Sequence, residues 1–107
     1  LGSLFSKDKY NIAKCGDTPL HKAITANNYN LVEKMLRNGA SPNVSTDYGY
    51  TALHLTALHD NYQIAELLLK YEADPTIKSL RECLTTKELA MKHKSWNVVK
   101  TIEENGY

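Results

Sequence analysis

An internal repeat is the strongest constraint on how this chain can fold. The segment 16–43 recurs without a gap as the segment 49–76, at a constant offset of 33 residues. The matching pairs include Thr18 and Thr51, Leu20 and Leu53, His21 and His54, Leu36 and Leu69, and Pro42 and Pro75. A fixed period between about 20 and 50 residues is typical of units that cannot bury their apolar faces alone and must stack to form a core. We therefore expect a repeat protein.

Each repeated unit predicts two short helices. Thr18 followed by Pro19 is a helix start, because threonine caps the first turn and proline is tolerated at the first helical position. Asparagines at 27–28 predict a break, and a second helix follows at about 30–37, with Gly39 as its C-terminal stop. The apolar residues fall at helical spacing; they are Leu20, Ala23, Ile24, Leu31, Val32, Met35 and Leu36.

A third unit is looser than the first two. The segment 85–90 aligns at an offset of 34, so one residue has been added within 79–84. Lys87 and Glu88 replace the leucine and histidine of the earlier units, and Glu103 replaces an apolar residue of the second helix. A charge at that position predicts a polar outer face, which is typical of a capping unit.

The repeat period predicts the domain organisation. We interpret residues 1–15 as the remnant of an expression tag followed by the degenerate tail of a preceding unit, since 4–15 shows no clear helical period. The predicted units are 16–48, 49–82 and a C-terminal cap at 83–107. The segment 44–50, closed by a glycine, is expected to form a protruding turn or short hairpin.

Composition excludes several classes of function. The 107 residues carry 13 Lys+Arg and 12 Asp+Glu, a net charge of +1, which argues against binding of nucleic acid through phosphate neutralisation. The longest apolar run, 67–69, is far short of the ~20 residues of a membrane span. No signal peptide is recognisable at the start. Cys15 and Cys83 are expected to be free thiols in a reducing compartment, so we expect an intracellular location, cytoplasmic or nuclear.

The repeated motifs resemble those of ankyrin repeats. The resemblance rests on GDTPLHKA at 16–23 and GYTALH at 49–54, each followed by the second-helix pattern and by GASPN at 39–43 or EADPT at 72–76. It implies an all-α solenoid of stacked helix-turn-helix units with protruding β-turn or hairpin connections. It also implies a non-enzymatic module that binds proteins.

The candidate chemical residues have structural interpretations. The resemblance implies that His21 and His54 bond to backbone near the turn of their own or a neighbouring unit. His59 and His93 have no cysteine, aspartate or glutamate at ligand spacing, so we expect no metal and no other cofactor. The lysine-rich segment 87–100 suggests either a phosphate site or, more simply, a solvated face. No pair of groups has the spacing that catalysis needs.

The aromatic residues fall into two groups. Tyr29, Tyr62 and Trp96 occupy equivalent positions at the start of the second helices, and this regularity predicts packing within the scaffold. Tyr48 and Tyr50 flank Gly49 and have no aromatic counterpart in the first unit. A position that varies between matching units is free of the packing constraint, and tyrosine suits a binding surface. These two tyrosines are therefore predicted binding residues.

In ankyrin arrays, partners commonly bind to the concave face, formed by turn tips and the exposed sides of the first helices. Carried over to this chain, the predicted partner-binding residues are Asp17, Thr25, Asp47, Tyr48, Tyr50, Leu58, His59, Arg81, Glu82 and Lys92. Leu58 either packs on a neighbouring residue or is available to contact a partner. We predict a hot spot that includes Tyr48, Tyr50, Leu58 and His59, surrounded by charges that tune specificity.

The favoured function is an interaction module for a protein or peptide partner, without a small-molecule substrate, without nucleic acid and without a membrane span. Two alternatives remain open at this point. In the first, the array is a regulatory or targeting fragment of a larger enzyme or channel. In the second, it is a structural spacer that self-associates.

Overall fold

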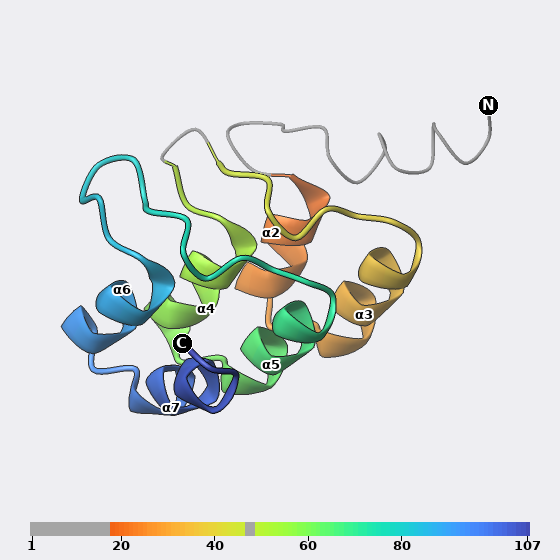
Figure 1. Cartoon of the computed structure of the whole chain (residues 1–107). Coiled ribbons are helices and arrows are strands. Elements are labelled where there is room, and N and C mark those ends of the chain that lie inside the picture. Colours follow the sequence, from red (N-terminus) through yellow and green to blue (C-terminus); the bar gives the residue numbers. More distant parts are fainter. Residues whose placement is uncertain (1–17, 47–48) are drawn as a thin grey trace.

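A computed structural model describes residues 18–46 and 49–107, which form six α-helices and no strand. The helices are α2 (Pro19–Thr25), α3 (Tyr29–Arg37), α4 (Ala52–His59), α5 (Tyr62–Lys70), α6 (Thr86–Lys92) and α7 (Trp96–Glu104). They form three helix pairs, each joined by a short turn (Figure 1). The all-α, helix-turn-helix expectation is confirmed, and both predicted helices of the first unit lie within about a residue of their expected places.

The helices are arranged in two layers. The first helices α2, α4 and α6 contact one another in sequence, and the second helices α3, α5 and α7 do the same. Long connections lie along one edge of the array, and the short turns within each pair lie along the opposite edge (Figure 1). Backbone hydrogen bonds connect parts of the long connections: the amide of Thr46 donates to the carbonyl of Tyr50 at 2.9 Å.

The first helix of every pair begins with a reciprocal capping box. In α4, the Thr51 hydroxyl accepts the His54 amide at 3.3 Å, and His54 Nδ1 accepts the Thr51 amide at 3.2 Å. In α6, the Glu88 carboxylate accepts the Thr85 amide at 2.9 Å in the same way. Glutamate at this position is therefore a replacement that preserves the cap, because it supplies the acceptor that the histidine ring supplies elsewhere.

The core is shared between units. Its fully buried apolar side chains come from all three pairs and include Leu20, Ile24, Val32, Leu53, Ile64, Leu68, Leu89, Val98 and Ile102. Leu31, at an apolar position of the predicted second helix, is instead about a third exposed. The described helices have only 7 to 9 residues each, too few for independent stability, so stacking between units supplies what local structure cannot.

Polar side chains also connect one unit to the next. Asp60, which ends α4 in a left-handed conformation (φ 53°), accepts the Val98 amide at 3.1 Å and the Asn97 side chain at 2.9 Å. It thereby satisfies an amide at the start of α7 that has no partner within its helix. Asn43 accepts the Asp74 amide at 2.8 Å in the same inter-unit manner.

The prediction that Tyr29, Tyr62 and Trp96 pack within the scaffold is wrong. Their exposed fractions are 40%, 43% and 57%. Each is the first residue of a second helix and lies at the edge where the two helices of a pair join. The regular spacing reflects an equivalent position in the fold, and that position is largely open to solvent.

Two charged residues on which the predicted polar face of the C-terminal pair rests contact each other. Lys87 forms an ion pair with Glu103 at 3.2 Å, and the Lys87 amine also donates to the carbonyl of Tyr107. Both charged residues stand where earlier units have apolar ones. The capping role of this unit stays a prediction.

Leu53→Ala is expected to lower the free energy of unfolding by about 2–5 kcal/mol, because Leu53 is completely buried between helix pairs. Urea denaturation followed by circular dichroism measures the change. Leu31→Ala is the control and should cost less than about 1 kcal/mol, since that side chain is partly exposed. Equal losses of stability for the two variants would contradict the assignment of the core.

Candidate functional site

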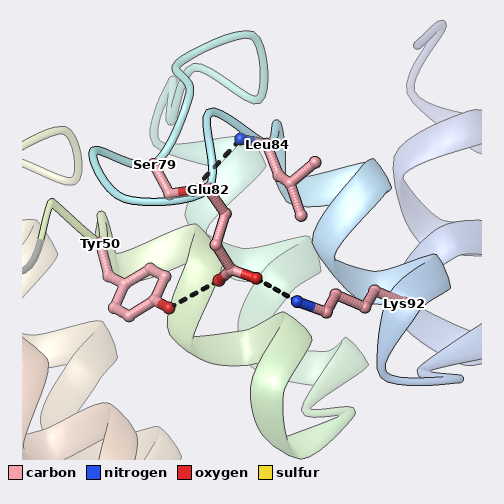
Figure 2. A network of polar contacts seen from close by, with 5 residues as sticks. All are labelled: Tyr50, Ser79, Glu82, Leu84 and Lys92. Atoms are coloured by element: carbon pink, nitrogen blue, oxygen red, sulfur yellow. Dashed lines mark hydrogen bonds and ion pairs between the residues drawn. The ribbon is translucent and has the colours of Figure 1, made fainter.

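Three of the ten predicted binding residues lie outside the described residues: Asp17, Asp47 and Tyr48. Three others, Tyr50, Glu82 and Lys92, contact one another (Figure 2). The four that remain are Thr25, Leu58, His59 and Arg81.

Glu82 is the centre of a network that joins three separate elements. The Tyr50 hydroxyl donates to one carboxylate oxygen of Glu82 at 2.9 Å, and the Lys92 amine donates to the other (Figure 2). Tyr50 precedes α4, Glu82 lies between α5 and α6, and Lys92 ends α6. The network therefore holds two neighbouring long connections against the end of a first helix.

The electrostatics of the network favour its charged form. Hydrogen bonds from Lys92 and Tyr50 lower the pKa of Glu82 below its ordinary value. The bond to Glu82 raises the pKa of Lys92 and, with burial, that of Tyr50. At neutral pH the three groups are thus a carboxylate, an ammonium and a neutral phenol.

The loop that carries Glu82 is closed by its own hydrogen bonds. The Ser79 amide donates to the Leu84 carbonyl at 2.8 Å, and the Leu84 amide donates to the Ser79 hydroxyl at 3.2 Å (Figure 2). Cys83 within this loop has a left-handed backbone, with φ 54°. This is the segment to which one residue has been added relative to the repeat period, so the addition coincides with the turn that presents Glu82.

Gly49 allows the two long connections to meet closely. Its φ is +80°, and a Cβ atom built there would lie 2.1 Å from the Leu80 Cβ and 2.5 Å from the Leu80 amide nitrogen. Any larger residue would push the loops apart. The side chain of Leu80 is 71% exposed at this junction. We did not predict Leu80 as a site residue, although a leucine between Ser79 and Arg81 in a polar turn is a signal for one.

Tyr50 and Leu58 are less free than the sequence suggests. Tyr50 is half-buried against the core, and its ring centre lies 6.0 Å from that of His54. The expectation that Tyr50 has no packing role is therefore wrong. Leu58 is also half-buried and packs against the core, so its packing alternative is the one the structure supports. The partly exposed area of each side chain is what stays accessible to a partner.

Thr25, His59 and Arg81 are exposed, as a contact surface requires. The Thr25 hydroxyl donates to the His21 carbonyl of its own helix at 3.0 Å. Within the described part of the chain, no hydrogen bond joins Thr25 or His59 to the network around Glu82. Arg81 lies next to Glu82 in the same loop and acts on the charge environment of Tyr50.

His54 fastens the candidate site to the scaffold. Its Nδ1 accepts the Thr51 amide, so Nε2 carries the proton and donates to the Leu84 carbonyl of the next connection at 2.9 Å. Burial lowers the pKa of His54, although the bond to Leu84 opposes that shift. The structural role implied for this histidine is confirmed, since one neutral ring bonds to backbone in two units.

The described residues hold no sign of two other kinds of site. In 18–46 and 49–107, no group of three or more His, Cys, Asp or Glu side chains could hold a metal ion. Nor does any helix there combine the length and apolar character needed to cross a membrane. Cys83 is an exposed free thiol, as predicted, and Cys15 lies outside the described residues.

Comparison with known families identifies the repeat. A family model described as ankyrin repeats, in three copies, matches residues 2–79, which is most of the chain. No curated protein matches the chain significantly. The protein belongs to the ankyrin-repeat family, whose repeats generally mediate protein interactions and are typically non-enzymatic. The matched segment ends before α6 and α7, which nevertheless repeat the same helix pair and capping box.

Tyr50→Phe separates the hydroxyl of Tyr50 from its ring. We expect it to lower the free energy of unfolding by about 0.5–1.5 kcal/mol, because the hydrogen bond to Glu82 that it removes is partly buried. Tyr50→Ala also removes ring packing and should cost roughly 1–3 kcal/mol. Urea unfolding measures both variants, and an unchanged stability of Tyr50→Ala would contradict the packing role.

His54 makes stability sensitive to mild acid. Its pKa in the folded chain lies below its ordinary value of 6.5, so the unfolded chain binds the proton more tightly. The stabilisation that depends on neutral His54 is therefore fully present above about pH 6.5, and it is lost as the pH drops below that value. We expect a lower urea midpoint at about pH 5.5 than at about pH 7.5. A midpoint that rises on acidification would contradict the assignment of a neutral, buried His54.

Proposed function

We propose that this chain is an intracellular protein-binding module whose partner contacts the tip surface, defined here as Tyr50, Leu80, Arg81, Glu82 and Lys92. The observation that carries the proposal is the network around Glu82. It places residues from three elements beside an exposed leucine and holds them in one arrangement before a partner arrives. Preorganisation of this kind lowers the entropic cost of binding.

The composition of the tip surface favours a protein partner. It combines an apolar side chain, a tyrosine and charges of both signs, which is the mixture found where an apolar anchor is surrounded by polar contacts. The exposed sides of the first helices, at Thr25, Leu58 and His59, extend the surface. The predicted residues Asp17, Asp47 and Tyr48 remain part of this proposal by their positions in the repeat.

The identity of the partner is the first thing to establish. The chain, immobilised and exposed to cell extract, should retain a protein that mass spectrometry identifies. Light scattering of the purified chain at two concentrations tests the alternative of a self-associating spacer. A mass that grows with concentration, together with no retained protein, would contradict the proposed function.

Leu80→Ser then tests the tip surface itself. Because Leu80 is exposed, we expect stability to change by less than about 0.5 kcal/mol. Binding of the identified partner should weaken by about 1–3 kcal/mol, as measured by isothermal titration calorimetry. Leu31→Ser is the matched control on α3, away from the tip surface, and should leave the affinity unchanged. Equal affinities for the three proteins would place the partner elsewhere.

A further inference from the structure

A second surface lies at the turn from α6 to α7, on the edge opposite the long connections (Figure 1). Its main feature is Trp96, the only tryptophan in the chain, which is 57% exposed. The residue one helical turn later, on the same face of α7, is Lys100. In α3 and α5 the residues equivalent to Lys100 are Glu33 and Glu66.

The turn before Trp96 shows the same change of charge. Asn27, Asp60 and Lys94 occupy one equivalent position, and all three have a left-handed backbone, with φ of 56°, 53° and 59°. The scaffold is thus unchanged, while the side chain goes from neutral to acidic to basic. Basic charge at this edge is therefore a property of the third unit alone, and the geometry of the repeat does not require it.

The sequence around this turn is mainly basic. Between Glu88 and Glu103 the sequence contains three lysines and a histidine but no carboxylate. Among the described residues, the side-chain amines of Lys94 and Lys100 make neither a hydrogen bond nor an ion pair. Glu104 lies one turn beyond Lys100, and the nearby Asp60 carboxylate is occupied by Asn97 and the Val98 amide.

Met91 adds apolar area beside this turn. It is 49% exposed, whereas its equivalents Ile24 and Ala57 are buried beneath the next helix pair. We call Met91, Lys94, Trp96 and Lys100 the turn surface. It presents two large apolar side chains and two uncommitted ammonium groups, while the chain as a whole is close to neutral.

We propose that the turn surface binds the headgroup region of an anionic lipid bilayer. Tryptophan is enriched at membrane–water interfaces, where its ring lies in the headgroup layer. Lysines near an anionic surface are attracted to it, and their stems cover apolar surface while the amines stay in water. Because the charges are few, the association is peripheral and reversible. It goes beyond the proposed function, since it uses residues outside the tip surface and a different kind of partner.

The chemistry of the turn surface favours a bilayer over an acidic protein. The four residues are exposed, and they lie at the end of α6, in the turn that follows it and in the first half of α7. A bilayer offers an interfacial layer for Trp96 and anionic headgroups for the lysines in the same contact. An acidic peptide would pair with the lysines but would supply no such interfacial layer for the indole ring.

Emission from Trp96 gives a direct test, because no other tryptophan contributes. Vesicles of equal parts phosphatidylcholine and phosphatidylserine should shift the emission to shorter wavelength and carry the chain into the pellet on centrifugation. Vesicles of phosphatidylcholine alone should do neither, and high salt should reverse the binding. Absence of binding to the mixed vesicles, or equal binding to both kinds, would overturn the proposal.

The side chains at equivalent positions of the second unit suggest a test variant. Lys94→Asp with Lys100→Glu copies the side chains of the second unit, so the fold should tolerate it, which circular dichroism checks. We expect the affinity for mixed vesicles to fall at least about tenfold. Lys34→Glu with Lys78→Glu makes the same change in net charge on exposed residues elsewhere and should retain binding.

Two further results would overturn the proposal. One is an equal loss of vesicle binding in the control variant, which would indicate that binding depends on the net charge of the chain and not on the turn surface. The other is an equal shift of Trp96 emission with soluble polyglutamate, which would indicate a site for acidic protein. Neither result bears on partner binding by the tip surface, because that binding is tested with Leu80→Ser.

Discussion

Burial between units is the interaction on which this structure depends. Each helix has fewer than ten residues and could not persist alone in water. Leu53 and Leu68 are fully buried because helices from neighbouring pairs pack around them. Stability and shape therefore arise together from the stacking of like units, and a core side chain truncated in one unit weakens the neighbouring units as well.

The histidine of the capping box connects local structure to this stacking. His54 completes the cap of α4 with one ring nitrogen and bonds to the Leu84 carbonyl with the other. Leu84 belongs to the loop that carries Glu82, so the ring that starts a helix also positions the neighbouring connection. In the third unit Glu88 keeps the cap, but its carboxylate has no N–H group with which to donate to a neighbouring carbonyl.

Differences between equivalent positions are the best indicators of function in a repeat protein. The shared geometry at positions 27, 60 and 94 shows that the backbone there is set by the fold. Changes of side chain on that constant backbone are then free to serve binding. The turn surface arises in this way, whereas the tip surface uses a connection that is one residue longer than in the earlier unit. A single array can therefore present two surfaces of different chemistry without a change of fold.

The sequence by itself determined the family, the helix pairs and most of the core, because period, capping residues and apolar spacing are local signals. It also indicated Tyr50, Glu82 and Lys92, but as separate tip and helix residues. Only the tertiary structure joined them into one network, since Tyr50 and Glu82 are 32 residues apart and meet through the stacking of units. Stacking likewise decided that Tyr50 and Leu58 are half-buried, and that Trp96 and Leu80 are exposed. Periodicity shows that positions are equivalent, but whether an equivalent position is covered depends on which elements pack over it.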